Sequence, residues 1–326
     1  MTGVVLIADS KGKGYGFAKG IYEYVRGKER RDFEISLTDI KKTIFKDDEF
    51  KVRINDNIRR RICFFIHDSN KNPCEWFTEL AFTLQAMGFS SPSEINLVLP
   101  YTRFARQDRK DESRVSVNAK AVADVVSLYA NRGLTVDLHA PGIQQYFKIP
   151  FDNLYSMPVL LDSLQKKHPE ILEDLVVVSP DAGGGKRVES LVKRLAKRGI
   201  NADVAYGNKQ RTQENKVEKS VVIGDVENKN CLVVDDMIDT GGTLVGVEKV
   251  LREKKAKAVY AYGTHGLFTE GIDKLKGFDK VFTSDTLCCN ESKNIEIISL
   301  SDLFGEAVFR TVKGESLSDL FDDGKN

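Results

Sequence analysis

The residues with the clearest chemical potential lie between positions 231 and 244, where an apolar run leads into acidic residues and a Thr-Gly-Gly-Thr turn. Glycines let backbone N–H groups close around a phosphate, threonine hydroxyls add donors, and the N-terminus of a following helix favours an anion. Carboxylates beside a phosphate repel it unless they bind sugar hydroxyls or Mg²⁺, directly or through water. The pattern therefore favours a phosphorylated sugar as the ligand. The residues concerned are Asp235, Asp236, Asp239, Thr240, Gly241, Gly242 and Thr243.

Other interpretations of the glycine-containing stretches are weaker. A capped helix after a strand would leave three acids unexplained, and the Gly-Lys-Ser/Thr ending of a Walker A loop is absent. A second stretch, Gly12-Lys-Gly-Tyr-Gly16, also follows an apolar run, but its glycine spacing is not GxGxxG. No acidic residue ends a second strand about twenty residues later, so we do not assign NAD binding to it.

A cationic stretch follows the apolar run at 95–100. Arg106, Arg109 and Lys110 could neutralise a polyphosphate, and Gln107 lies between them. The alternative is a solvated charged face. We favour function because the segment directly follows a strand, where ligands gather in α/β proteins.

Two further residues lie just beyond expected strands. Asp181 supplies a hard oxygen ligand of the kind that Mg²⁺ prefers. His139 alone would more often be a structural histidine, but its place at a strand end supports a metal ligand. A polar stretch between Tyr206 and Ser220 has almost no apolar residues, and it is either a disordered hairpin tip or a lid that closes over the reacting groups.

The elements that must position these residues are short β-branched runs alternating with amphipathic helices. Strands that are apolar throughout, separated by helices, indicate a parallel sheet covered on both faces, and hence the α/β class. A division near residues 150–158 gives each side its own strands and helices, so we expect domains at 1–155 and 156–326. The expected strands lie at 4–8, 95–100, 134–138, 175–179, 231–234 and 258–263.

Composition excludes several classes of protein. Of the 326 residues 41% are hydrophobic and 30% charged, the balance of a globular domain. A formal charge of +1 argues against a general nucleic-acid binder, which needs a basic surplus. The five cysteines show no CxxC spacing, so neither a disulfide framework nor a zinc site is indicated. No apolar run approaches about 18 residues. We therefore expect a cytoplasmic protein that does not span a membrane.

The stretch from Cys231 to Leu244 resembles the phosphoribosyl-diphosphate (PRPP) binding motif of type I phosphoribosyltransferases and PRPP synthetases. Other segments resemble only the second group, the ribose-phosphate diphosphokinases. Tyr101-Thr-Arg-Phe-Ala-Arg-Gln-Asp-Arg-Lys110 is similar to their ATP-binding segment, and Thr135-Val-Asp-Leu-His-Ala140 to the segment that follows it. Val178-Ser-Pro-Asp-Ala-Gly-Gly184 is similar to the next one. The similarities occur in the family's order and cover most of residues 45–250.

This resemblance implies a fold, a reaction and a set of roles. The fold is two tandem phosphoribosyltransferase-like domains, and the reaction transfers the β,γ-diphosphoryl group of MgATP to ribose 5-phosphate, giving PRPP and AMP. His139 and Asp181 match the residues that hold Mg²⁺ on the ATP phosphates. Lys209 and Arg211 match the cations of the catalytic loop. The ATP contacts are matched by Phe45, Asp47, Glu49, Arg106, Gln107, Arg109 and Lys110. The resemblance also implies a homo-oligomer that is built from dimers, either a single dimer or a hexamer.

Some positions depart from the family pattern, and two alternatives stay open. Asp48 stands where the family has glycine, Ser116 where proline is common, and Asn118 where a small hydroxyl residue is usual. The alternatives are a PRPP-consuming phosphoribosyltransferase, which would not need ATP, and a non-catalytic regulatory paralogue. His139, Asp181 and the acidic turn are all present, and this counts against a non-catalytic paralogue, which could have lost them.

Overall fold

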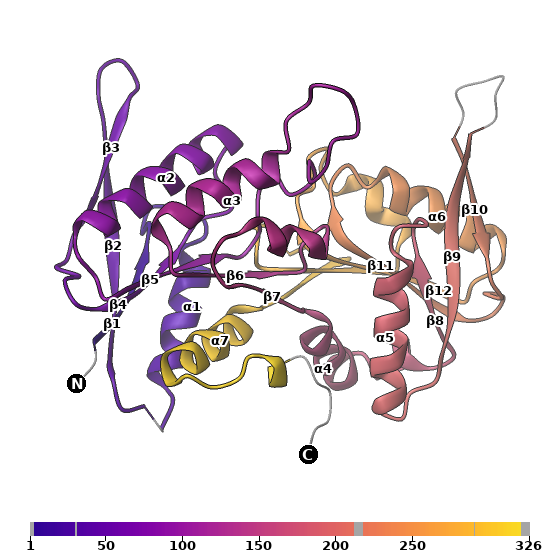
Figure 1. Cartoon of the computed structure of the whole chain (residues 1–326). Helices are drawn as coiled ribbons and strands as arrows, with labels where there is room; N and C mark the ends of the chain where they lie inside the picture. The colour runs from indigo at the N-terminus through magenta and orange to yellow at the C-terminus, as the bar shows by residue number, and fades with distance from the viewer. Residues whose placement is uncertain (1–2, 30, 212–217, 290, 321–326) are drawn as a thin grey trace. The chain divides into compact units, whose positions relative to one another are not determined.

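The computed structural model describes residues 3–29, 31–211, 218–289 and 291–320, apart from the side chains of 209–211 and 218–219. The chain divides into two compact units. The first comprises residues up to Tyr155 together with Thr286–Cys288 and Leu300–Leu320, and the second comprises Ser156–Asp285 and Cys289–Ser299. Each unit is built on one sheet (Figure 1).

The sheet of the first unit has seven strands in the order β3-β2-β1-β4-β5-β6-β7. Every neighbouring pair is parallel except β2 and β3, which form an antiparallel hairpin. The strand order reverses direction between β1 and β4, the place where open α/β sheets bind ligands. The strands are β1 (Gly3–Ala8), β2 (Glu34–Ile44), β3 (Phe50–Ile54), β4 (Ile62–Ile66), β5 (Glu94–Leu99), β6 (Arg132–Val136) and β7 (Phe151–Leu154).

The sheet of the second unit repeats this topology, with the order β10-β9-β8-β11-β12-β13-β14. Again one edge pair, β9 and β10, is antiparallel and the other pairs are parallel. The reversal here lies between β8 and β11. The strands are β8 (Leu175–Ser179), β9 (Ala202–Arg211), β10 (Glu218–Ile223), β11 (Asn230–Ile238), β12 (Ala258–Gly266), β13 (Lys280–Ser284) and β14 (Ile295–Ile298).

Helices connect the parallel strands. The described helices are α1 (Tyr15–Arg26), α2 (Pro73–Phe89), α3 (Asn118–Tyr129), α4 (Met157–Lys167), α5 (Gly185–Lys197), α6 (Gly242–Glu253) and α7 (Ser301–Lys313). Short 3₁₀ helices are η1 (Pro141–Tyr146), η2 (Pro169–Leu172), η3 (Asp273–Gly277) and η4 (Ser318–Leu320).

Local sequence explains why these elements form. β8 is apolar from Leu175 to Val178 and every residue in it is buried, as a central parallel strand requires. α5 places Val188, Leu191 and Leu195 on one buried face, at three- and four-residue spacing. The predicted α/β class, with two tandem halves, is confirmed.

The two halves exchange their last helices. α4 follows β7 of the first sheet but belongs to the second unit, and α7 follows β14 of the second sheet but belongs to the first. In Figure 1 the yellow α7 lies beside the indigo α1. Phe304 of α7 is fully buried, and its ring meets Phe17 edge-on at 5.3 Å between centroids. We expected residues up to 326 to form the second domain; this packing instead groups α7 with the first.

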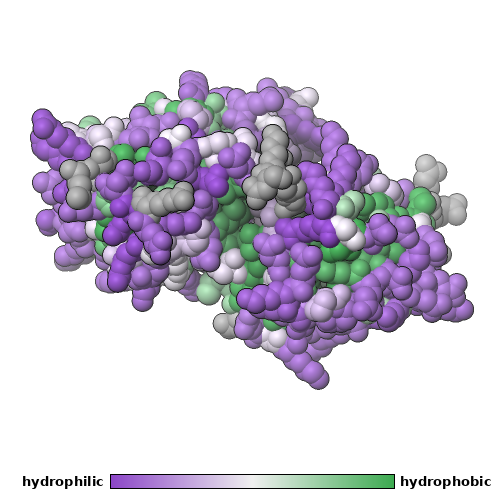
Figure 2. All heavy atoms as spheres, turned by 90° about the horizontal axis from the view of Figure 1, so that it is seen from below, coloured by the Kyte–Doolittle hydropathy of each residue, from purple (hydrophilic) through white to green (hydrophobic). Residues whose placement is uncertain are grey.

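One face of the molecule shows its polar character. Hydrophilic residues cover most of the face drawn in Figure 2, with apolar side chains exposed in limited areas. Within the described ranges, no helix is both long and apolar enough to span a membrane.

The exchange of helices predicts that a change in α7 weakens the first unit. Phe304→Ala should lower the free energy of unfolding by about 3–5 kcal/mol, because a large buried aromatic leaves a cavity. Hydrogen exchange should then rise in α1 and β1 before it rises in α5 and β8. Loss of protection confined to the second unit would contradict the exchange.

Candidate active site

Asp235 and Asp236 lie within β11, at a point where one side of this strand is no longer paired with β8. The β8 pairing ends at Val233↔Val178, whereas the β12 pairing continues to Ile238↔Gly266. The strand is therefore longer than the apolar run at 231–234 predicted. Its unpaired side lies at the reversal of strand order in the second sheet, so the two acids occupy the position where such sheets bind ligands.

Arg187 of α5 binds both carboxylates. Its Nη1 donates to Asp235 Oδ1 and its Nη2 donates to Asp236 Oδ1, each at 2.8 Å. Sequence reasoning did not identify Arg187 as a site residue. One signal was present: a basic residue in the first turn of a helix opposes the helix dipole, so it needs another reason to be there. Here the reason is the pair of acids it partly neutralises.

The charged form of Asp235 remains unfavourable despite this arginine. Burial, together with the neighbouring Asp236, raises the pKa of Asp235 to about 7, although Arg187 acts in the opposite direction. The amide of Asp236 also donates to Asp235 Oδ1 at 2.9 Å. Asp235 is thus able to carry a proton near neutral pH, when it can donate a hydrogen bond as well as accept one.

The Thr-Gly-Gly-Thr turn joins β11 to α6. Gly241 is the N-cap of α6 and has φ = 75°, a left-handed conformation that glycine adopts without strain. Thr240 Oγ1 accepts a hydrogen bond from the amide of Gly242 at 3.4 Å, and Asp239 Oδ1 accepts one from the Thr269 hydroxyl at 2.6 Å. Thr240 and Gly242 are exposed. The first amides of α6 are available to an anion at this turn.

Asp181 lies in the loop after β8, at the same reversal point. Its Oδ1 accepts hydrogen bonds from the amides of Gly183 and Gly184 at 2.9 and 3.1 Å, which fixes the loop that leads into α5. The side chain is exposed. Asp181 therefore belongs with Asp235, Asp236 and the α6 turn at one edge of the second sheet.

His139 lies in the first unit, three residues beyond the end of β6, and is exposed. No group of three or more His, Cys, Asp or Glu in the described ranges is arranged to hold a metal ion. Mg²⁺ is commonly bound by one or two carboxylates together with substrate phosphates and water. The oxygen of Asp181 fits that requirement.

The predicted polyphosphate contacts lie in the loop after β5. Arg106, Arg109 and Lys110 are exposed there. Gln107 has a structural part: its amide nitrogen donates to the carbonyl of Arg109 at 2.9 Å and to Asp111 Oδ1 at 3.1 Å. The loop is thus internally braced while its cations face outward.

Phe45, Asp47 and Glu49 form the tip of the β2–β3 hairpin. The Phe45 amide donates to the Glu49 carbonyl at 2.7 Å, and Glu49 donates its amide to Asp47 Oδ1 at 3.2 Å. Phe45 is 48% exposed. Asp48 has φ = 65°, which explains why glycine suits this position in the resembling family.

Lys209 and Arg211 lie on the backbone of β9, which pairs with β10 through Ser220↔Lys209 and Glu218↔Arg211. Their side chains, and residues 212–217 of the predicted lid, lie outside the described part of the chain.

The glycines of the stretch 12–16 have a packing role. A Cβ on Gly12 or Gly14 would lie 2.5 or 2.7 Å from a carboxylate oxygen of Asp68, which is itself buried. Close approach of the chain to Asp68 therefore requires glycine at both positions.

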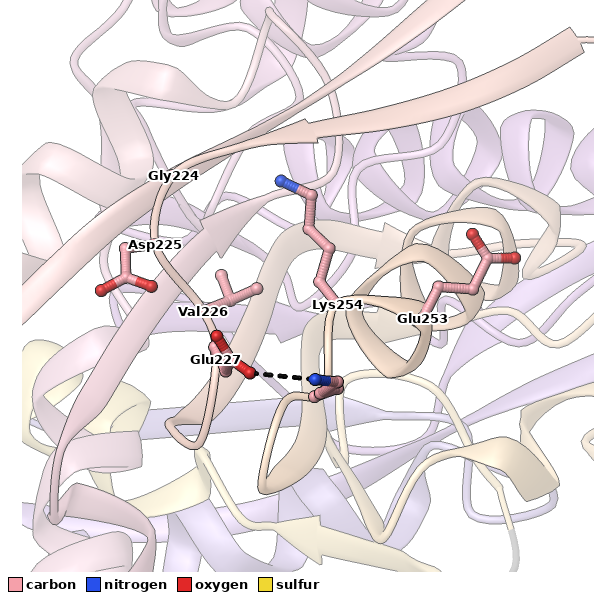
Figure 3. Close-up of a pocket in the computed structure, with 7 residues that line it drawn as sticks. Gly224, Asp225, Val226, Glu227, Glu253 and Lys254 are labelled. Atoms are coloured by element: carbon pink, nitrogen blue, oxygen red, sulfur yellow. Dashed lines mark hydrogen bonds and ion pairs between the residues drawn. The ribbon is translucent and has the colours of Figure 1, made fainter.

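A separate pocket of about 330 Å³ lies at the C-terminal end of α6 (Figure 3). It is about 18 Å of helix away from the Thr-Gly-Gly-Thr turn. Glu227 and Lys255 pair across it at 3.3 Å. It contains none of the predicted site residues. Its lining is Gly224, Asp225, Val226, Glu227, Glu253, Lys254 and Lys255.

Comparison with known proteins gives matches in both halves of the chain. Residues 14–129 match the N-terminal domain of ribose phosphate pyrophosphokinase, and residues 203–322 match the phosphoribosyl synthetase-associated domain. The ribose-phosphate pyrophosphokinase of Aquifex aeolicus is 42% identical over 88% of this chain and 92% of its own length. The chain belongs to the ribose-phosphate pyrophosphokinase family. The resemblance seen in the motifs is confirmed.

Two further relatives support the same family. The ribose-phosphate pyrophosphokinase of Chlorobaculum tepidum is 41% identical, with 88% of each chain covered. The crystal structure of phosphoribosylpyrophosphate synthetase from Mycobacterium smegmatis superposes with a TM-score of 0.84 at 27% identity, covering 96% of this chain and 100% of that one. That structure therefore has the same fold as this chain.

The pair of carboxylates, one half-buried (Asp235) and one buried (Asp236), predicts a pH dependence of stability. Because the pKa of Asp235 is raised to about 7, the folded protein keeps a proton that the unfolded chain has released. The free energy of unfolding contributed by this group is therefore full below about pH 4 and falls as pH rises through about 7.

Asp235→Asn removes that dependence. Urea unfolding should find the variant about 1–2 kcal/mol more stable relative to the parent at pH 8 than at pH 4.5, since one pKa unit corresponds to about 1.4 kcal/mol and some solvent reaches the site. Asp162→Asn, which removes an exposed carboxylate paired with Arg198, serves as the control and should run parallel to the parent. Parallel curves for both variants would contradict the raised pKa.

The left-handed residue of the hairpin gives a second prediction. Asp48→Gly should slow hydrogen exchange at the amides of Phe45 and Asp48, because it relieves about 1 kcal/mol of backbone strain at the tip. Asp48→Val should speed exchange by a similar factor, since a β-branched residue tolerates this conformation poorly. Equal exchange in the two variants would show that the tip does not depend on this conformation.

Proposed function

We propose that the chain transfers the β,γ-diphosphoryl group of MgATP to the 1-hydroxyl of ribose 5-phosphate, giving PRPP and AMP. The observation that carries this proposal is the 42% identity with the Aquifex aeolicus enzyme over 88% of the chain. The site adds a chemical reason, because a phosphate cradle beside acids at the end of a strand suits a phosphorylated sugar.

Ribose 5-phosphate is proposed to bind in the second unit. The first amides of α6 and the hydroxyls of Thr240 and Thr243 would hold the 5-phosphate, while Gly241 and Gly242 let the backbone approach it. Asp235, Asp236 and Asp239 would accept hydrogen bonds from the ribose hydroxyls. Arg187 lowers the repulsion between these acids and the phosphate.

ATP is proposed to bind in the first unit. Arg106, Arg109 and Lys110 are exposed and would neutralise the polyphosphate. Gln107 would hold the loop in shape. The hairpin tip, with Phe45, Asp47 and Glu49, would contact the adenine and its ribose, because the exposed aromatic ring offers a stacking surface and the two acids offer hydrogen-bond acceptors.

His139 of the first unit and Asp181 of the second are each proposed as a ligand of Mg²⁺. When bound on the ATP phosphates, Mg²⁺ supplies neutralisation of the charge that develops during transfer. The proposal rests on the strand-end positions of both residues and on the hard carboxylate oxygen of Asp181.

In the proposed reaction the 1-hydroxyl oxygen of the sugar attacks the β-phosphorus of ATP. A bond forms between them, the bond from the β-phosphorus to the oxygen bridging to the α-phosphorus breaks, and AMP leaves with that oxygen. The hydroxyl proton is released to solvent. Catalysis of such transfers depends mainly on position and on cations around the phosphoryl group. Lys209 and Arg211 are the proposed cations of the lid, which would also exclude water as a competing acceptor.

Two properties of the assembly remain part of the proposal. The family relationship supports a homo-oligomer, and the five cysteines, an odd number with no CxxC spacing, support a reducing, cytoplasmic location.

The proposal is tested by following AMP release from ATP, Mg²⁺ and ribose 5-phosphate. The parent should release AMP only when both substrates are present. Lys209→Ala should still bind ATP but lose at least about a hundredfold in kcat, because cationic stabilisation of the transition state typically contributes that much. Ribose-independent AMP release, or undiminished turnover by the variant, would overturn the assignment. PRPP consumption without ATP would point to a phosphoribosyltransferase instead.

A further inference from the structure

We infer that Glu79 is a positioning residue that couples the two segments proposed to contact ATP. It reaches the β2–β3 hairpin through Lys42, and it reaches the loop after β5 through Lys71 and Ser69. This inference rests on the proposed function, and it concerns residues that no motif of the sequence singled out.

Glu79 lies on the inner face of α2 and its side chain is fully buried. One carboxylate oxygen, Oε2, receives both lysines: Lys71 Nζ at 2.8 Å and Lys42 Nζ at 3.3 Å. The other oxygen, Oε1, lies 3.9 Å from Nδ1 of buried His67 and has no hydrogen-bond partner among the described residues. Burial lowers the pKa of His67 to about 3, so this histidine is neutral and adds no charge. The lysines are therefore the cations that balance Glu79.

The first branch of the network leads to the hairpin. Lys42 lies in β2, three residues before Phe45, and also pairs with Glu75 one turn before Glu79. Its ammonium lies 5.2 Å over the ring of Phe50, the first residue of β3. The ring of Phe50 in turn packs against Phe82 of α2 at 5.5 Å. The part of the hairpin next to its tip is thus held on α2, since Phe50 pairs with Ile44, the last residue before the tip.

The second branch leads to the loop after β5. Lys71 is only 8% exposed and also binds Asp9 at 2.5 Å, which fixes the segment that follows β4. Two residues earlier, the buried hydroxyl of Ser69 accepts from the Tyr101 amide and donates to the Tyr101 carbonyl, both at 3.0 Å. The carbonyl of Ser69 accepts a hydrogen bond from Arg103 Nε at 2.9 Å. The start of the loop that carries Arg106 is therefore held by the segment that Lys71 anchors.

Stability alone gives a poor account of such a network. Burial by itself would lower the pKa of Lys71, and the hydrogen bonds to Asp9 and Glu79 are needed to raise it. In a buried ion pair, the attraction between the charges offsets little more than the free energy lost when they leave water. Apolar residues of similar size often stabilise a core at least as well. Apolar contacts have no preferred direction, unlike hydrogen bonds, so apolar residues would not hold the hairpin and the loop in one geometry.

The test compares Glu79→Gln with a matched control, Glu306→Gln. Glu306 lies in the same unit, also binds two cations, Lys28 at 2.6 Å and Arg310 at 2.8 Å, and carries no proposed substrate contact. Both variants remove one charge without changing size. We expect both to lower Tm, while only Glu79→Gln weakens ATP binding, by about tenfold, with the KM for ribose 5-phosphate within about twofold of the parent.

ATP affinity is measured by calorimetry without ribose 5-phosphate, so the result does not depend on turnover. If the parent binds ATP but releases no AMP, the proposed function fails and the inference is still tested. If the parent is active and Glu79→Gln binds ATP as tightly as Glu306→Gln, the inference alone is overturned.

Two gentler variants keep the test decisive if Glu79→Gln does not fold. Lys42→Met removes only the ion pairs that link α2 to the hairpin, and Ser69→Ala removes only the hydrogen bonds of the Ser69 hydroxyl to Tyr101 at the start of the loop. Each should weaken ATP binding by about threefold to tenfold, and the two together should weaken it by less than the product, because coupled sites are not additive. Unchanged affinity in both variants would overturn the inference.

Discussion

The charge balance at the end of β11 is the constraint on which the second unit depends. Two adjacent carboxylates lie at the reversal of strand order, and Arg187 binds one oxygen of each at 2.8 Å. Without a cation, two buried acids would repel each other and any phosphate bound at the turn of α6. The helix that supplies Arg187 must therefore begin close to β11, and the loop after β8, fixed by Asp181, starts it there.

The first unit also places acids beside a cation at its reversal of strand order, but there the charges are largely buried. At its own reversal of strand order, Lys71 binds Asp9 and Glu79, and all three side chains are nearly inaccessible to solvent. Glycines at 12 and 14 let the chain close over Asp68. The same topology thus carries an exposed Thr-Gly-Gly-Thr turn in one half and a largely buried ion cluster in the other. The exposed cations of the first half lie one strand further along, after β5.

Local chemistry is what the sequence predicted well. The Thr-Gly-Gly-Thr turn, the strand before it and the α/β class follow from short-range patterns, since a strand, a glycine turn and a helix start each have their own signal. The left-handed φ of Asp48 was not predicted; the sequence showed only that Asp48 stands where the family has glycine. The family resemblance added the reaction and the roles of single residues, which no pattern of hydrophobicity contains.

Contacts between distant segments are what the sequence did not reveal. Nothing in the local pattern of α7 says that Phe304 packs on Phe17, because its apolar face would suit either sheet. Arg187 and Asp235 are 48 residues apart, and their pairing depends on β8 and β11 being neighbours. The cluster around Glu79 joins segments from β1, β2, β4 and α2 in the same way. Since burial of a charge is tolerated only where partners converge, such clusters become visible only when the sheet order is known.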